Sequence, residues 1–230
     1  GSATVPNSPD ELVDFRNNVI YNWMNNNIYG GEKGRYNVVD NYFKPGPATS
    51  KNRKDRILNP SEPYGKFFVT GNVLEESDAI SANNQLGVVA AQVEAALTDT
   101  PFPFEKITDQ DAKTAYVQVL SFAGASLKRD SVDVRVIEEA RLGTSASGKS
   151  RNGIIDSQND VGSWPELKST PAPMDTDGDG MPDDWERKNK LNPNEASDAA
   201  QHTLSKTYTN IEVYINSLVE EKTNMLKKPK

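Results

Sequence analysis

One short pattern occurs three times near the start of the chain, as Val13-x-Phe15-x-x-Asn18-Val19-Ile20, Tyr36-x-Val38-x-x-Asn41-Tyr42-Phe43 and Phe67-x-Val69-x-x-Asn72-Val73-Leu74. In each copy, apolar residues lie five and three positions before an asparagine, and two more follow it. Alternating apolar residues predict a strand with one buried face. The asparagine predicts a bend, because it tolerates a positive φ and its side-chain amide can bond neighbouring groups.

The spacing of the three copies predicts how they pack. Their asparagines are 23 and 31 residues apart. Repeats of this length, each with too little apolar surface to fold alone, are typical of stacked solenoids. We therefore expect residues 11–75 to form short parallel strands, with Asn18, Asn41 and Asn72 stacked as an internal ladder. The alternative is an antiparallel meander in which the asparagines recur by chance.

A second pattern lies near the other end of the chain. Residues 175–186 read DTDGDGMPDDWE and match the twelve-position calcium-loop pattern D-x-D-x-D-G-x5-E at every specified position. Calcium takes six to eight oxygen ligands, and the spacing predicts an EF-hand-like site for it. The expected ligands are the carboxylates of Asp175, Asp177 and Asp179, the Met181 carbonyl, Asp183 directly or through water, and a bidentate Glu186. An acidic surface turn is the alternative.

The residues on either side of this loop indicate its role. A helix is expected from Pro182 or Asp183 to about Lys190, since proline is tolerated at a first helical position. Upstream, Pro165 and the segment 169–173 with its two prolines prevent an entering helix. A sensor EF-hand needs that helix, so we expect a rigid structural calcium site of extracellular type.

Composition excludes several classes of protein. The 230 residues carry a net charge of −7, which argues against a nucleic-acid partner because phosphates would be repelled. The sequence has no cysteine, which excludes disulfides and zinc-thiolate sites. It has no apolar run long enough to span a membrane and no signal-peptide pattern. No Ser/His/Asp set, Cys/His pair, phosphate-binding glycine loop or HExxH motif supports a hydrolase or a nucleotide-binding protein.

One basic loop stands out in this acidic chain. Residues 51–56 read KNRKDR and place four cations within six positions. Arginine matches a carboxylate in a bidentate fork, so Arg53 and Arg56 are candidate ligands for the carboxylates of an anionic polymer. A solvated loop without a ligand is the alternative.

Helices are expected in the remaining sequence. Thr108 with Asp111 resembles a capping box, and the helix that follows should end at Gly124. A second helix is expected from Asp130 or Ser131 to Leu142, before Gly143.

The segments around the acidic loop carry three further expectations. Residues 144–164 should form an extended arm over the body, because Ile154, Ile155 and Trp164 favour burial. Thr209 and Glu212 predict a capping box for a last helix, whose apolar stripe is Ile211, Tyr214, Ile215, Leu218 and Val219. Residues 222–230 are expected to form a frayed basic tail.

Several stretches together resemble one known family. They are VDFRNNVIYNW at 13–23, YGGE at 29–32, NYFKPGP at 41–47, the acidic loop at 175–186 and YTNIEVYINSL at 208–218. The chain is similar to the C-terminal part of a Bacteroidetes-type pectate lyase of polysaccharide lyase family 1. The resemblance implies a right-handed parallel β-helix and a secreted, extracellular or periplasmic location. It also implies β-elimination of polygalacturonate, in which Ca²⁺ acidifies the uronate and an arginine removes the C5 proton.

The resemblance has one important departure. In that family the catalytic arginine and the aspartates that hold the substrate calcium lie on coils before the part that resembles residues 13–23. Only Gly1 to Leu12 precede it here, and they contain no Arg, Lys or His. We therefore assign no catalytic residue and expect the chain alone to be inactive, with acidic polysaccharide (pectate) and the missing N-terminal half of the β-helix as its partners. A stand-alone extracellular calcium-dependent binding or docking module is the alternative.

The expected fold class is mainly β with an α appendage. Residues 1–98 should form the last coils of a partial right-handed parallel β-helix. Residues 99–164 should form a two-helix cap and the extended arm, and residues 165–230 the calcium-binding loop and the C-terminal helix.

Overall fold

The computed structural model describes residues 11–108 and 110–226 of the chain, which divides into two compact units. The repeat unit comprises the described residues up to Ala125 together with Arg129–Pro165. The acidic-loop unit comprises Ser126–Lys128 and the described residues from Glu166 onward. Each unit is considered by itself below.

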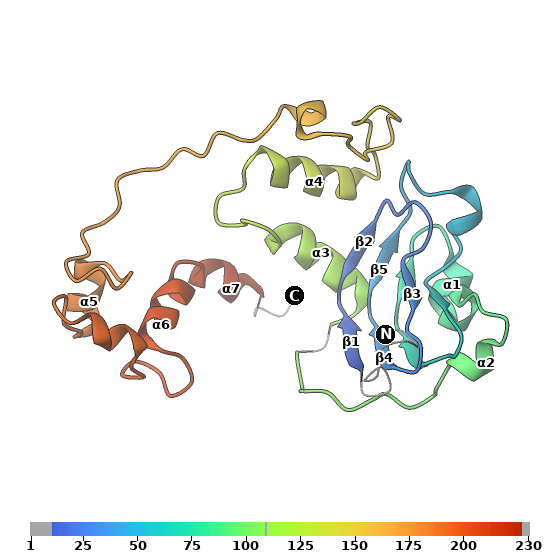
Figure 1. Ribbon diagram of the computed structural model, residues 1–230, viewed down its shortest axis with the longest axis horizontal. Coiled ribbons are helices and arrows are strands. Elements are labelled where there is room, and N and C mark those ends of the chain that lie inside the picture. The colour runs from blue at the N-terminus through green and yellow to red at the C-terminus, as the bar shows by residue number, and fades with distance from the viewer. Residues whose placement is uncertain (1–10, 109, 227–230) are drawn as a thin grey trace. The chain divides into compact units, whose positions relative to one another are not determined.

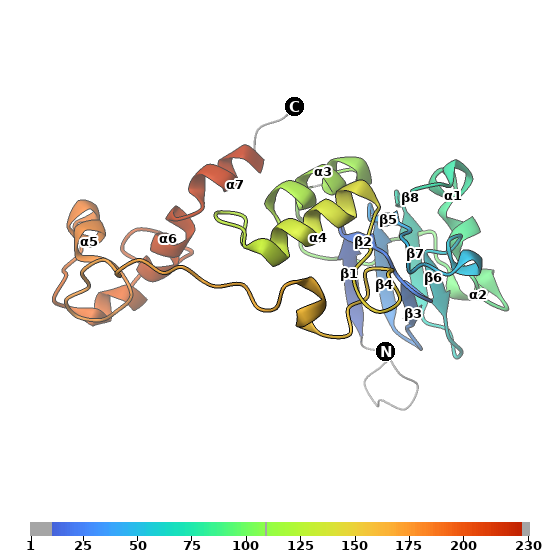
Figure 2. The same cartoon turned by 90° about the horizontal axis from the view of Figure 1, so that it is seen from above.

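The repeat unit is built on parallel strands in small sheets (Figures 1 and 2). The strands are β1 (Leu12–Arg16), β2 (Val19–Tyr21), β3 (Ile28–Gly30), β4 (Arg35–Val39), β5 (Tyr42–Lys44), β6 (Leu58–Pro60), β7 (Lys66–Thr70) and β8 (Val73–Leu74). They form sheets of order β1-β4-β7, β2-β5-β8 and β3-β6. The first two repeats therefore pass through the three sheets in the same order, and the third repeat adds β7 and β8 to the first two sheets.

The register of these sheets confirms the expected parallel pairing. Val13 pairs with Tyr36, which in turn pairs with Phe67, so equivalent positions of the three copies stack on one another. The Tyr36 and Phe67 rings stack with centroids 4.6 Å apart. All strand pairs among the described residues of these sheets are parallel, which excludes the antiparallel meander. The arrangement is compatible with the expected partial parallel β-helix.

The predicted asparagine ladder is present between the sheets. Asn18 donates from its side chain to Asn41 Oδ1 at 2.9 Å, and Asn41 donates in the same way to Asn72 Oδ1 at 2.9 Å. The backbone N–H groups of both residues donate to the same two oxygens at 3.0 Å. A fourth residue that the sequence pattern did not include, Asn84, accepts from Asn72 in the same way and ends the ladder.

The bend itself differs from the expectation. The positive φ falls on the residue before each asparagine, namely Asn17 at 56°, Asp40 at 52° and Gly71 at 68°. The ladder asparagines do not have this conformation. Their role is to bond neighbouring coils, whereas the preceding residue turns the chain.

Apolar side chains from all three repeats fill the interior of this unit. The buried cluster contains Trp23, Tyr36, Val38, Phe43, Ile57, Leu58, Phe67, Leu74, Ile80, Val88 and Ala96. Short helices continue the chain around the sheets: η2 (Lys51–Arg53), α1 (Asp78–Ala82), η3 (Asn84–Gly87) and α2 (Val93–Ala96). Of these, α1 lies next to β8 and α2 next to β7.

Two longer helices cover one side of the strands. In both views α3 (Ala112–Phe122) lies by β2 and β5, and α4 (Ser131–Leu142) lies by α3. The predicted bounds of α4 are confirmed, with Asp130 as N-cap and Gly143 as C-cap. The predicted start of α3 is wrong, because Asp111 itself is the N-cap and accepts from the N–H groups of Lys113 and Thr114.

Lys44 anchors both helices to β5. It is buried, and its ammonium group lies 3.2 Å from Glu75 Oε1. The same group donates to the Tyr116 hydroxyl of α3 at 3.3 Å and to the Arg141 carbonyl of α4 at 3.2 Å. One lysine thus joins a strand and two helices.

The expected burial of the arm's apolar residues is wrong. Ile154, Ile155 and Trp164 are 43%, 39% and 77% exposed. The arm is instead held by polar contacts, such as the bond from the Asn22 side chain to the Asn152 carbonyl at 2.9 Å. A short 3-10 helix, η4 (Gln158–Val161), begins at Ser157 with a capping box.

The acidic-loop unit is made of short helices and turns. They are α5 (Asp183–Asn189), η5 (Ala196–Ala200), α6 (Asn210–Ser217) and α7 (Glu220–Leu226). Helix α6 has the predicted Thr209–Glu212 capping box, but three of the five residues of the expected apolar stripe are exposed, including Ile215 at 55%. The predicted frayed tail is helical up to Leu226, because Glu220 and Glu221 favour a helix N-terminus; residues 227–230 lie outside the described part. Within the described residues, no helix has the length and apolarity that a membrane span requires.

Candidate metal centre

The acidic loop is shaped by its own carboxylates. Asp175 accepts from the N–H groups of Gly178 and Gly180, at 2.8 and 3.0 Å. Asp179 accepts from the Met181 N–H at 2.7 Å. Gly178 and Gly180 have φ of 74° and 95°, a region that favours glycine, so these residues make the sharp turn. The expected helix after the loop is confirmed as α5, and no helix enters the loop from residues 165–174.

Glu186 is the most unusual group in the loop. It lies in α5, it is 0% exposed, and neither of its carboxylate oxygens has a hydrogen-bond partner. Burial, together with the negative charges of Asp179, Asp177 and Asp198, raises the pKa of Glu186 to about 7. An unpaired buried carboxylate is strongly unfavourable, so this position calls for a compensating cation.

The acidic side chains gather into two overlapping groups among the described residues. One oxygen each from Asp175, Asp177 and Asp179 lie within 4.8 Å of one another, and so do one oxygen each from Asp179, Glu186 and Asp198. Asp198, on η5, was not among the predicted ligands. Nothing in the twelve-position pattern could have indicated it, because the fold brings it back from twelve residues beyond Glu186.

Two other predicted ligands, Asp183 and Met181, are also buried. Asp183 is buried, and both of its oxygens are occupied: Oδ1 accepts from the Thr176 N–H, and Oδ2 accepts from the Thr176 hydroxyl and from Arg187, each at 2.8 Å. The hydrogen bond from the Thr176 hydroxyl is the main reason that the pKa of Asp183 is lowered. Met181 is fully buried, and its carbonyl belongs to the turn that leads into α5.

The donor set fits a hard divalent cation. Five buried carboxylate oxygens have no hydrogen-bond partner: Asp177 Oδ2, Asp179 Oδ2, Glu186 Oε1, Glu186 Oε2 and Asp198 Oδ1. Native proteins leave few buried polar atoms unsatisfied, so five in one small unit indicate a missing positive group. Calcium prefers an all-oxygen shell rich in carboxylates, which these residues can supply.

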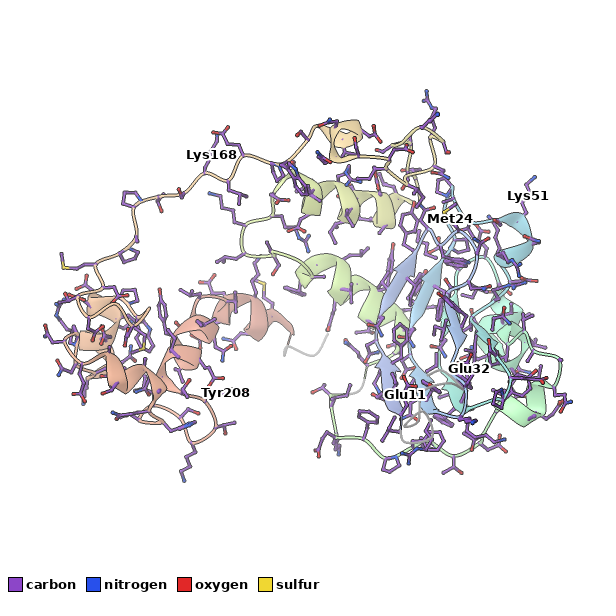
Figure 3. All side chains as sticks on the ribbon, viewed as in Figure 1. Glu11, Met24, Glu32, Lys51, Lys168 and Tyr208 are labelled. Atoms are coloured by element: carbon purple, nitrogen blue, oxygen red, sulfur yellow. The ribbon has the colours of Figure 1, made fainter. Side chains whose placement is uncertain are left out.

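Most cations of the basic loop, residues 51–56, are less exposed to solvent than the sequence suggests. Arg56 is buried, and its guanidinium donates to the Asn52 carbonyl at 3.1 Å; burial lowers its pKa. Lys54 lies 3.0 Å from Glu76. Arg53 is half-buried, whereas Lys51 is exposed and points away from the body (Figure 3). Arg53 and Lys51 are thus more accessible than the buried Arg56.

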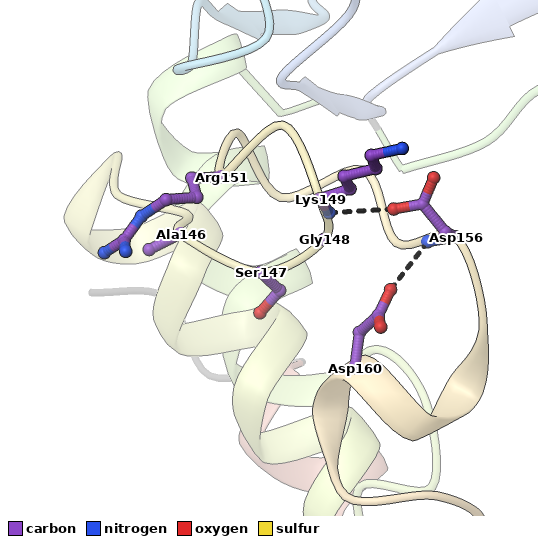
Figure 4. A pocket seen from close by; sticks show the side chains of 7 residues that line it. All are labelled: Ala146, Ser147, Gly148, Lys149, Arg151, Asp156 and Asp160. Atoms are coloured by element: carbon purple, nitrogen blue, oxygen red, sulfur yellow. Dashed lines mark hydrogen bonds between the residues drawn. The ribbon is translucent and has the colours of Figure 1, made fainter.

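A shallow depression lies on the arm of the repeat unit (Figure 4). It has a volume of about 760 Å³, and its lining includes Lys149, Arg151, Asp156 and Asp160. Asp156 accepts from the Lys149 N–H, and Asp160 accepts from the Asp156 N–H, both at 2.8 Å. Both carboxylates therefore serve to fold the arm.

Comparison with known proteins identifies relatives of one kind. The chain is 33% identical over 212 residues to "Probable pectate lyase C" of Aspergillus terreus, 34% over 215 residues to that of Aspergillus flavus and 32% over 213 residues to that of Emericella nidulans. Each match covers 90% of this chain but 48% of the relative, so the chain spans about half the length of these proteins. No family model matches the chain. The chain is thus similar to part of proteins named probable pectate lyases, and the Bacteroidetes-type assignment remains a prediction.

Proposed function

We propose that the repeat unit forms coils of a right-handed parallel β-helix in a secreted pectate lyase that cleaves polygalacturonate by calcium-assisted β-elimination. The observation that carries the proposal is the similarity to probable pectate lyases over 90% of the chain, and the parallel stacking of the repeats agrees with it. A polymeric substrate of this kind is met outside the cell, where calcium is plentiful.

The catalytic groups are proposed to lie in the part of the relatives that this chain does not span. Both acidic groups with metal-ligand spacing in the described residues belong to the acidic-loop unit, so the described repeat unit offers no such group for a substrate calcium. The N-terminal half of such a β-helix would supply the arginine that removes the C5 proton. This chain would then contribute contacts along the polymer, with Arg53 better exposed for a uronate carboxylate than Arg56.

The calcium of the acidic loop has a structural role in this proposal. Its ligands are Asp175, Asp177, Asp179, the Met181 carbonyl and Glu186, and it supplies the positive charge that the buried oxygens lack. Asp183 braces the loop through Thr176 and Arg187, and it can contribute to the ion through water. Residues 165–174 form no helix before the loop, and a sensor EF-hand needs one in order to open, so the proposed role is structural.

The activity is tested by joining this chain to the residues of the Aspergillus terreus relative that it does not match. The chimera should convert polygalacturonate into an unsaturated product with ultraviolet absorbance, and EDTA should stop the reaction. The chain alone and the fungal part alone are the controls, and neither should increase the ultraviolet absorbance. A folded chimera without product, under conditions where the fungal parent is active, would contradict the lyase proposal.

The chain alone provides the second arm of this test. Product formed by the chain alone and lost in Arg53→Ala would show that catalysis resides here. The alternative function, a stand-alone calcium-dependent binding module, is favoured by the compactness of the acidic-loop unit. Calcium-dependent retention of the chain on polygalacturonate, combined with an inactive chimera, would support that alternative.

A further inference from the structure

Asp198 is a buried residue with one carboxylate oxygen that has no hydrogen-bond partner. It lies on η5, it is 6% exposed, and its Oδ2 accepts from the Asn192 N–H at 3.0 Å. Its other oxygen, Oδ1, is buried and has no hydrogen-bond partner. Desolvating an ionised carboxylate is costly, so a fold that buries one without a donor requires a cation next to it.

The unused oxygen faces other groups of the same kind. Oxygens of Asp179, Glu186 and Asp198 lie within 4.8 Å of one another, and Glu186 is fully buried with both oxygens unpartnered. Carboxylates that share one ion approach to this distance, since Ca²⁺–oxygen bonds are about 2.3–2.6 Å long. No Lys or Arg has an ion pair with any of these three residues in the described part of the chain.

Asp183, at the ninth position of the loop, uses both of its carboxylate oxygens in hydrogen bonds within the protein. In the twelve-position pattern this position, here Asp183, contributes directly or through water. Both Asp183 oxygens already accept hydrogen bonds from Thr176 and Arg187, which leaves a place in the coordination shell for a ligand from outside the loop.

We propose that Asp198 is a ligand of the calcium ion held by the acidic loop. This inference rests on the calcium site of the proposed function and is independent of the lyase activity. Asp198 also links the ion to the segment that follows, because its carbonyl accepts from the buried Asn210 side chain at 2.8 Å. Asn210 begins α6 and accepts from the Leu204 N–H at 3.1 Å. Calcium therefore connects the loop to η5 and to the start of α6.

Calorimetric titration of the metal-free full chain with calcium chloride tests the proposal. Asp198→Asn should weaken calcium binding about tenfold or more, because affinity in such sites follows the number of charged ligands. Asp184→Asn is the matched control: it removes the same charge from within the loop, but its side chain is 99% exposed and pairs with Arg187. The control should change the affinity by less than about twofold, as expected for a screened surface charge.

The outcomes separate the two proposals. If the wild-type chain binds no calcium, the calcium site of the proposed function fails. If wild type binds and Asp198→Asn binds equally well, only the role of Asp198 is overturned. Should Asp198→Asn fail to fold, an experimental structure of the calcium-loaded wild type decides instead. A distance from Asp198 Oδ1 to calcium of about 2.3–2.6 Å supports the proposal, and an oxygen outside the coordination shell overturns it.

Discussion

The two units bury polar groups in opposite ways. In the repeat unit, the buried amides of Asn41, Asn72 and Asn84 bond one another and nearby carbonyls. In the acidic-loop unit, the buried carboxylates of Glu186 and Asp198 keep oxygens without donors. An amide carries both donors and an acceptor, whereas an ionised carboxylate only accepts. A stack of amides can therefore complete itself, and a cluster of carboxylates needs an added cation.

Removing calcium should produce the largest effect, a difference in amide hydrogen exchange between the two units. In EDTA, amide hydrogens from Asp175 to Val213 should exchange much faster, because five unpartnered oxygens then repel one another. Amides of β4 and β7 should keep their protection. At a hundredfold excess over Kd, calcium stabilises the folded unit by about 2.7 kcal/mol, so its melting temperature should rise.

Two substitutions check that this response belongs to the loop. Asp177→Ala and Glu186→Ala should each abolish the calcium-dependent protection, as followed by hydrogen-exchange mass spectrometry. Equal exchange in EDTA and in millimolar calcium would mean that the carboxylates are satisfied without the ion.

Breaking the asparagine ladder should give the next largest effect. Asn41→Ala removes donors to Phe15 O and Asn72 Oδ1 and the acceptor of two bonds from Asn18. Since a buried group left unsatisfied costs about 1–3 kcal/mol, we expect a loss of about 3 kcal/mol in unfolding free energy. Urea titration followed by circular dichroism measures this loss.

The matched substitution lies at the edge of the same ladder. Asn18 is half-buried, so Asn18→Ala should cost about 1 kcal/mol. Neither cost should depend on calcium. Equal costs for the two variants would indicate that burial does not control the energy of the ladder.

A smaller effect is expected from acid titration of the repeat unit. Arg16 binds both oxygens of Asp14, at 2.9 and 3.1 Å, and holds the pKa of Asp14 below its usual 3.8. The ionised carboxylate therefore contributes stability above pH 3.8, which is lost as the pH falls through the lowered pKa. Asp14→Asn should lower stability at pH 7 by about 1 kcal/mol or less and flatten the loss below pH 4. Exposed Asp99→Asn serves as the control in acid denaturation, and an unchanged acid profile for Asp14→Asn would refute the assignment.

Local patterns in the sequence predicted the features that depend on local spacing. Strand register followed from the recurrence of Asn18, Asn41 and Asn72, because a parallel stack places equivalent positions on one another. The bounds of α4 followed from its caps. The sharp turn expected at the glycine of the acidic loop is present and is shaped by bonds within a few residues, while the calcium ligands of the loop remain a prediction.

Features that depend on distant parts of the chain were not predictable in this way. Asp198 is brought near Glu186 by its place in η5, and Asn84 reaches the ladder from the 3-10 helix η3. Trp164 was expected to be buried from its side chain alone, but burial needs a surface to cover it, and the described residues leave it 77% exposed.

The asparagine ladder also has a direction. Each of Asn18, Asn41 and Asn72 donates its N–H and side-chain amide to the oxygen of the next asparagine. Asn84 breaks this rule, because its amide turns to the carbonyls of Asn72 and Ile80. Asn84 is therefore the last member of the ladder, because its side-chain N–H groups are already bonded and do not donate to the side chain of another asparagine. The asparagine ladder thus ends at Asn84, whereas parallel bridges from Val88 to Leu58 and from Leu97 to Phe67 carry the stacking of the backbone one step further.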